Sequence, residues 1–157
     1  MSNTFSGLEM LKIAILMEEE GADFYQKGAK NTTGEVREFL LNTADQELSH
    51  KELFSKLYDE MSLGKESEYL FDEEVTKYLA GLTENQVFNK NENLDAFKDL
   101  TTAVKSSLDK EELTVKIYSE LYDGVKDEGA KEVMSRIINE EKQHVAYFEN
   151  LIRTLEK

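Results

Sequence analysis

The two histidines of this chain each stand three positions after a glutamate. In the first pair Glu47 precedes His50. In the second pair Glu141 precedes His144. Residues three apart lie on the same face of an α-helix, so each pair directs a carboxylate and an imidazole toward one point. Two such helices facing each other could hold a pair of metal ions. The alternative is two exposed pairs on the surface.

Apolar residues recur at alternating steps of four and three in four segments, which is the pattern of amphipathic helices. We expect helices over residues 6–30, 32–61, 95–123 and 128–155. Each apolar seam has a carboxylate near its middle, and two seams also contain a histidine. These polar seam residues are Glu18, Glu47, His50, Glu111, Glu141 and His144. An unpaired charge in a core costs several kcal/mol, so this placement favours a metal site over surface pairs.

The turn between the first two segments is marked by Asn31 and Gly34 at its ends. Thr32 is followed three residues later by Glu35, which is the pattern of a capping box. We therefore expect Thr32 to cap the second helix.

The chain contains an internal repeat. Glu18 and Tyr25 recur as Glu111 and Tyr118, 93 positions later. The two glutamate–histidine pairs are 94 positions apart. The first and second helices, and the third and fourth, are therefore two copies of one hairpin.

The pattern weakens between the two hairpins, over residues 62–95. Glu68–Leu82 could form a shorter helix, whereas residues 83–93 are polar and typical of a loop. A connection of this length returns a chain to the same end of a bundle before the next helix. We expect one domain over residues 1–157. Its fold class is an all-α four-helix bundle of two repeated hairpins, with a long crossover between the second and third helices.

Composition excludes several classes of function. The net charge of −14 argues against a nucleic-acid partner and against an anionic membrane surface, because both require clustered Lys and Arg. The absence of cysteine excludes disulfides, thiolate zinc sites and iron–sulfur clusters, and fits a reducing cytoplasm. The apolar run Met10–Met17 is interrupted by Lys12 and is too short to span a bilayer. We expect a cytoplasmic protein without a signal peptide or membrane segment.

Carboxylates combined with imidazoles, without thiolates, suit iron or manganese and can accept zinc. Glu47 and Glu141 are the expected bridges between two ions. Glu18 and Glu111 are the expected terminal ligands, and each histidine binds one ion. Six protein ligands on two ions leave open positions, which could admit hydrogen peroxide or dioxygen.

Four segments resemble the rubrerythrin-like branch of the ferritin-like di-iron carboxylate superfamily. They are Glu18–Tyr25, Ala44–His50, Glu111–Tyr118 and Glu140–His144. Proteins of this kind take one glutamate from each of two helices and a Glu-x-x-His motif from each of the other two. The resemblance implies a four-helix bundle with a non-haem di-iron site. It also implies oxidoreductase activity, such as peroxide reduction or ferroxidase activity.

The chain departs from that family in two ways. Without cysteine it lacks the rubredoxin domain that supplies electrons in rubrerythrins, so the donor would be a separate protein or Fe(II) itself. Thr114 stands where those proteins have a further glutamate, one turn beyond the ligand of the third helix. The iron movement and full peroxidase activity attributed to that glutamate are left open.

Two tyrosines lie two turns from ligands on the same helix face. Tyr25 follows Glu18, and Tyr118 follows Glu111. Their hydroxyls are either satisfied within an ordinary core, or they hydrogen-bond to ligands and protect against stray radicals. Sequence alone weighs these two interpretations equally.

Acidic residues beside the proposed ligands fall off the seams. We interpret them as solvated surface residues: Glu19, Glu20, Glu112 and Glu140. Asp45 and Asp109 could orient a histidine, but such residues are more often plain surface.

Three classes of function remain. The first is a dinuclear metal enzyme, with iron as the preferred cofactor, that reacts with peroxide or dioxygen. The second is a non-catalytic metal-binding or iron-storage protein with the same site. The third is a metal-free helical interaction module. An oxygenase acting on a small organic substrate has less support, because no substrate pocket is evident. We also expect a homodimer, which is common in this fold.

Overall fold

The computed structural model describes residues 7–62, 94–124 and 128–156. Every regular element in these ranges is helical. The elements are α1 (Gly7–Lys30), α2 (Gly34–Ser62), the short 3₁₀ helix η2 (Leu94–Phe97), α4 (Leu100–Gly124) and α5 (Glu128–Leu155). The predicted all-α class is confirmed.

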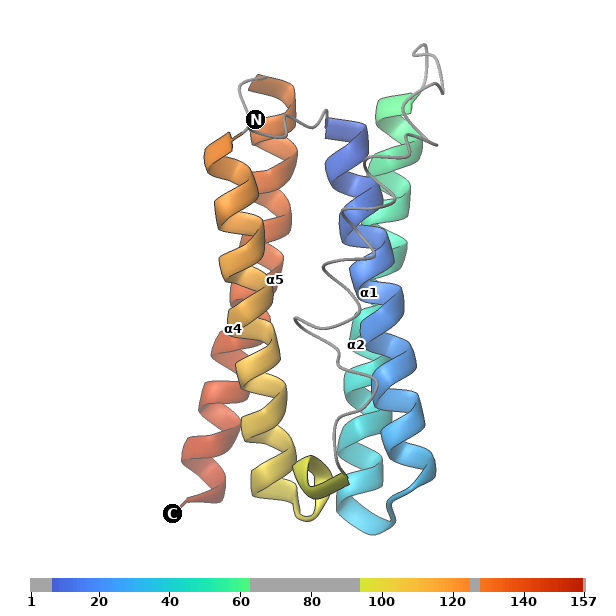
Figure 1. The fold of residues 1–157 in the computed structure, drawn as a ribbon, viewed down its shortest axis with the longest axis vertical. Coiled ribbons are helices and arrows are strands. Elements are labelled where there is room, and N and C mark those ends of the chain that lie inside the picture. The colour runs from blue at the N-terminus through green and yellow to red at the C-terminus, as the bar shows by residue number, and fades with distance from the viewer. Residues whose placement is uncertain (1–6, 63–93, 125–127, 157) are drawn as a thin grey trace.

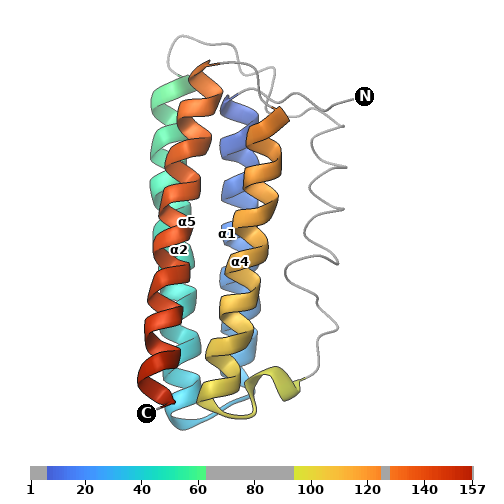
Figure 2. The ribbon, with the colours of Figure 1, turned by 90° about the vertical axis from the view of Figure 1, so that its left-hand side faces the viewer.

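The four long helices form a bundle of two antiparallel hairpins (Figure 1). Helix α1 packs along α2, and α4 packs along α5, while α1 also contacts α5 and α2 contacts α4. Helices α2 and α4 run in the same direction, so α2 ends at the opposite end of the bundle from η2 (Figures 1 and 2). The crossover and the shorter helix expected over Glu68–Leu82 lie outside the described residues.

The third long helix begins later than predicted. The sequence pattern placed its start near Asp95, whereas α4 begins at Leu100. The Asp99 side chain accepts a hydrogen bond of 2.7 Å from the backbone N–H of Thr102. An aspartate in this position caps a helix, so it fixes the start of α4, and the preceding residues form the separate turn η2. Phe97 of η2 is nevertheless buried in the core.

The prediction that Thr32 caps α2 was wrong. Its hydroxyl donates to the carbonyl oxygens of Gly28 at 3.1 Å and Ala29 at 3.3 Å, so it closes the end of α1. Carbonyl groups at the end of a helix lack partners within the helix, and a nearby hydroxyl satisfies them locally. Helix α2 instead begins at Gly34, whose φ of 63° lies in the left-handed region.

Replacing Gly34 by alanine is expected to destabilise the fold by about 1 kcal/mol, because a Cβ is unfavourable at positive φ. No atom would lie within 4 Å of the added Cβ, so the loss would come from the backbone and not from a clash. Thermal unfolding measures it. Gly34→Asn is the matched control and should lose less, since asparagine tolerates this conformation. Equal stability of Gly34→Ala and the wild type would contradict the prediction.

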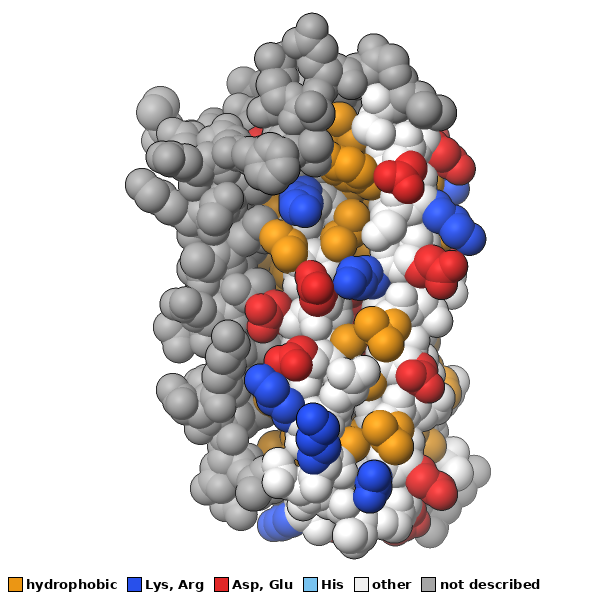
Figure 3. All heavy atoms as spheres, turned by 90° about the vertical axis from the view of Figure 1, so that its right-hand side faces the viewer, with side chains coloured by type: hydrophobic (Ala, Val, Ile, Leu, Met, Phe, Trp, Pro, Cys, Tyr) orange, Lys and Arg blue, Asp and Glu red, His pale blue; other side chains and the backbone are white. Residues whose placement is uncertain are grey.

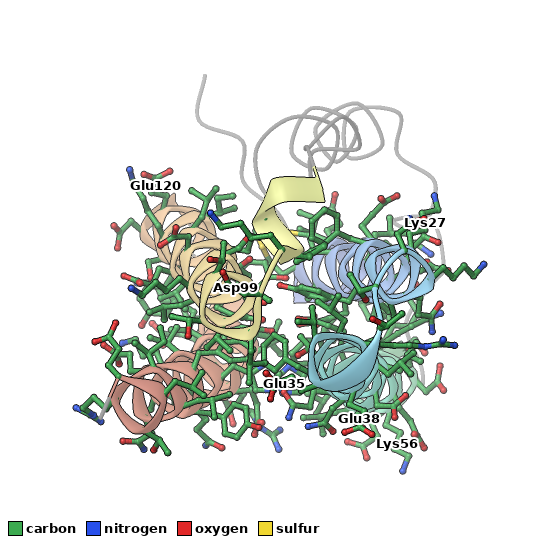
Figure 4. The ribbon with its side chains drawn as sticks, turned by 90° about the horizontal axis from the view of Figure 1, so that it is seen from below. Lys27, Glu35, Glu38, Lys56, Asp99 and Glu120 are labelled. Atoms are coloured by element: carbon green, nitrogen blue, oxygen red, sulfur yellow. The ribbon has the colours of Figure 1, made fainter. Side chains whose placement is uncertain are left out.

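The surface carries mixed charge. Acidic and basic side chains are interspersed on the face shown in Figure 3. In the view along the bundle, Lys27, Lys56 and Glu120 lie at its periphery (Figure 4). Among the described helices, none combines the length and apolar character required to cross a bilayer.

Candidate metal centre

The structure brings the six predicted side chains together in the middle of the bundle. Each of the four long helices supplies one glutamate, and α2 and α5 each add a histidine. The four carboxylates are almost fully enclosed, with exposed fractions of 1–3%, and both histidines are largely shielded from solvent. These residues are Glu18, Glu47, Glu111, Glu141, His50 and His144.

His50 lies against the glutamates of α1 and α5. Its Nδ1 is 3.3 Å from Oε1 of Glu141 and 3.5 Å from Oε1 of Glu18. This ring nitrogen therefore faces the carboxylate cluster. The other ring nitrogen, Nε2, faces away from these two residues, toward Glu140.

His144 has the equivalent position in the second hairpin. Its Nδ1 is 3.5 Å from Oε1 of Glu111. The two imidazole rings are stacked, with centroids 4.1 Å apart and planes at 20°. Each histidine thus approaches the glutamate from the first helix of its own hairpin, as expected if each imidazole serves one ion.

Two groups of potential ligand atoms are close enough to share an ion. One atom from each of His50, Glu141 and His144 lies within 4.8 Å of the others. The same holds for the group Glu47, Glu111 and His144. The two groups share His144, so together they involve five of the six predicted residues. The sixth, Glu18, lies beside His50.

The buried carboxylate oxygens of the cluster are suited to bind cations. Oε2 of Glu18, Oε1 of Glu47 and Oε2 of Glu111 are buried and have no hydrogen-bond partner in the described residues. They surround a small space that Met17 and Thr114 help to line. A buried carboxylate without a partner is costly, and a coordinated cation supplies both the missing contact and the missing charge. The donor set therefore fits a pair of metal ions.

Three of the four carboxyl groups are strongly perturbed. Burial raises the pKa of each well above its ordinary value of 4.5, and the negative charge of neighbouring carboxylates raises it further. These groups are Glu18, Glu47 and Glu111. Burial also acts to raise the pKa of Glu141, but hydrogen bonds with Glu18 and His50 outweigh it and hold that pKa at about 2. Without cations, these three groups therefore keep their protons to a higher pH than an ordinary carboxyl group does.

The pKa values of the two histidines are also shifted in opposite directions. Burial acts to lower the pKa of His50, but the hydrogen bond and charge of Glu141 outweigh it and raise that pKa. Burial and the nearby His50 lower the pKa of His144 to about 4. His144 is therefore neutral at physiological pH, which is the state that binds a metal.

The two tyrosines and Thr114 surround the cluster. Tyr25 and Tyr118 are both at most 1% exposed. Burial raises the pKa of Tyr118 well above its ordinary value, and Glu18 adds to the effect. The Tyr118 hydroxyl has no hydrogen-bond partner in the described part of the chain, so a hydrogen bond from it to a ligand remains a prediction. Thr114 donates its hydroxyl hydrogen to the carbonyl of Lys110 at 2.9 Å.

The neighbouring acidic residues divide into two kinds. Glu19 and Glu112 are exposed, as are Asp45 and Asp109, in agreement with the interpretation as surface, whereas Glu20 is partly buried. Glu140 differs, because its side chain is only 36% exposed and its Oε2 lies 3.7 Å from Nε2 of His50. Sequence reasoning assigned Glu140 to the solvated surface. Its place directly before Glu141 was the available signal for a role near the site.

Comparison with known proteins places the chain in a family. The rubrerythrin family model matches residues 9–152. A crystal structure described as a ferritin-like diiron-carboxylate protein from Thermotoga maritima is similar, with a TM-score of 0.54 and 25% sequence identity. The match covers 96% of this chain and 97% of that one. No curated protein sequence shows a significant match. With its candidate dinuclear site of buried carboxylates and imidazoles, the chain belongs to the rubrerythrin family.

Proposed function

We propose that this protein binds two iron ions and uses them to reduce hydrogen peroxide or dioxygen, as a peroxidase or ferroxidase. The observation that carries the proposal is the enclosed cluster of four carboxylates and two imidazoles, in which three carboxylate oxygens have no hydrogen-bond partner in the described residues. Hard oxygen ligands with neutral imidazoles suit iron. The family and the similar structure support the same choice of metal.

The residues divide between the two ions according to their positions. Glu18 and His50 would hold one ion, and Glu111 and His144 the other. Glu47 and Glu141, from the facing helices α2 and α5, would bridge them. Carboxylates from all four helices balance the charge of two divalent cations.

A pair of ferrous ions held by these residues would supply the two electrons that convert hydrogen peroxide to water. This reduction also consumes two protons. The carboxylates that hold the ions cannot supply these protons, because metal binding deprotonates them. Since the Thr114 hydroxyl hydrogen is donated to Lys110, its oxygen can accept a hydrogen bond from a bound peroxide. Burial of the cluster excludes bulk water.

An anaerobic Fe(II) titration followed by addition of peroxide tests this function. We expect two irons per chain, rapid oxidation of both by one equivalent of peroxide, and continued peroxide consumption when a chemical reductant is supplied. Metal analysis of protein purified without chelator gives the native ion. Saturable binding of zinc or manganese with no binding of iron would contradict the proposal, as would bound iron that peroxide does not oxidise.

A second candidate is iron binding or storage without turnover. The absence of cysteine favours it, because these residues cannot hold a cysteine-ligated electron-transfer centre beside the site. A catalytic role would therefore need electrons from a donor outside these residues. The two candidates differ in stoichiometry: a binding protein consumes peroxide once per site, whereas an enzyme continues as long as a reductant is present.

A further inference from the structure

The two ring nitrogens of His50 face carboxylates on opposite sides of the ring. Nδ1 faces Glu141 at 3.3 Å and Glu18 at 3.5 Å, inside the cluster. Nε2 faces Oε2 of Glu140 at 3.7 Å, on the side that is partly open to solvent. Glu140 and the predicted ligand Glu141 are adjacent on α5, so one helix turn places a carboxylate on each side of the imidazole.

Metal binding demands one tautomer of this ring. A nitrogen that binds a metal carries no hydrogen, so a neutral His50 that binds through Nδ1 must carry its hydrogen on Nε2. Without metal, a hydrogen on Nδ1 can be donated to Glu141 instead, which competes with binding. A carboxylate that accepts from Nε2 removes this competition by favouring the metal-binding tautomer.

We propose that Glu140 is a positioning residue that accepts the Nε2 hydrogen of His50 and selects its metal-binding tautomer. The proposal rests on the proposed dinuclear site. The present separation of 3.7 Å is longer than a hydrogen bond, so the proposal requires this contact to shorten when Nδ1 binds an ion. The partly exposed Glu140 side chain has the freedom to close this gap.

The other hairpin differs at the equivalent position. Gln46 directly precedes Glu47, as Glu140 precedes Glu141, so a neutral amide occupies the place of the carboxylate. The amide oxygen of Gln46 is buried without a hydrogen-bond partner in the described residues. Within those residues, the ion pair of His144 involves Nδ1 and not Nε2. The carboxylate support is therefore given to His50 alone, and the ion at His50 is the more tightly held.

A calorimetric Co²⁺ titration of the full chain tests the proposal. The wild type should bind two ions with unequal affinities. Glu140→Gln should weaken the tighter step by roughly 10- to 100-fold, the usual effect of removing a residue that orients a metal ligand. The weaker step should change little. Glu149→Gln is the matched control, because it removes the same charge from an exposed position of α5 and should leave both steps unchanged.

Nitrogen NMR of the histidine rings in the zinc-loaded protein gives a second measurement. The wild type should show His50 bound through Nδ1, with a hydrogen on Nε2 that exchanges slowly with water. Glu140→Gln should speed that exchange. A purely structural role of Glu140 would not change it. The chain has only two histidines, which makes their signals straightforward to assign.

The outcomes separate this proposal from the function on which it rests. If the wild type binds no Co²⁺, the dinuclear site is wrong and the role of Glu140 is wrong with it. If the wild type binds two ions and Glu140→Gln binds them equally well, the site stands and the role of Glu140 is overturned. Equal losses in Glu140→Gln and Glu149→Gln would also overturn it, because the effect would then be one of net charge.

Discussion

Replacing Glu47 by alanine is expected to abolish stoichiometric binding of the second metal ion, so the variant should hold one ion per chain or fewer. Glu47 comes from the middle of α2, is 2% exposed and has a buried oxygen without a hydrogen-bond partner among the described residues. As a proposed bridge it would contact both ions, so no neighbouring side chain could replace it. His144→Ala should have the same effect, because it removes the imidazole whose Nδ1 lies 3.5 Å from Oε1 of Glu111. Elemental analysis and Co²⁺ titration measure the stoichiometry.

Glu38→Ala is the control for this experiment. It removes the same charge from an exposed position of α2 and should leave two ions bound (Figure 4). Circular dichroism would show whether each variant retains its helices. If Glu47→Ala and His144→Ala remain folded and both still bind two ions, the ligand assignment is wrong.

The sequence predicted much of the fold because the four seams are regular. Helix α5 has the predicted bounds, and α1 and α2 begin and end within two residues of the predicted positions. The repeat of Glu18 and Glu111 predicted two similar hairpins, and these glutamates are buried at the centre as their seam positions required. A polar residue in an apolar seam has to be buried with its neighbours, so the periodic pattern alone brings the site together.

The details that sequence missed depend on local competition for hydrogen bonds. Asp99 caps α4 and Thr32 closes α1, yet both belong to stretches in which several residues could have capped a helix. The approach of Glu140 to His50 was also missed. It depends on how α5 is rotated against α2, and the spacing of residues along one helix gives no information about the rotation between two helices.

The metal-free protein should become less stable as the pH rises from about 5 to about 7.5. The folded state raises the pKa of three carboxyl groups above the ordinary value of 4.5, so it binds more protons than the unfolded state at pH values above 4.5. These groups are Glu18, Glu47 and Glu111. Their protonated forms are compatible with folding, and the stability that they contribute is lost as the pH rises toward their raised pKa values.

Two groups act in the opposite direction. The pKa of Glu141 is lowered to about 2, so its contribution is complete above 4.5 and is lost only at lower pH. The pKa of His144 is lowered from 6.5 to about 4, so its contribution declines as the pH falls below 6.5. Of these two groups, only His144 titrates between about pH 5 and about pH 7.5. Its effect on stability is opposed by those of the three carboxyl groups with a raised pKa. Thermal unfolding in the presence of a chelator should therefore show a falling Tm with rising pH.

Bound metal should reverse this trend, because cations replace the protons of the cluster and bind more tightly as the carboxyl groups ionise. Each ion at a free concentration of 100 times its Kd adds about 2.7 kcal/mol. For two ions and a chain of this size, that corresponds to a rise in Tm of roughly 10–20 °C. The rise should be larger at about pH 7.5 than at about pH 5, with protons released on binding.

The variant Glu47→Gln distinguishes a metal-binding protein from a metal-free interaction module. The substitution removes one ionisable group from the cluster while retaining its shape, so the metal-free Tm should depend less on pH than that of the wild type. The same substitution should remove most of the stabilisation by metal, because an amide is a poor bridging ligand. A smaller pH dependence of the metal-free Tm together with a loss of stabilisation by metal is expected only if cations keep the buried carboxylates in their charged form. A wild-type Tm that metal does not change, and that is as high at about pH 7.5 as at about pH 5, would instead support the interaction module.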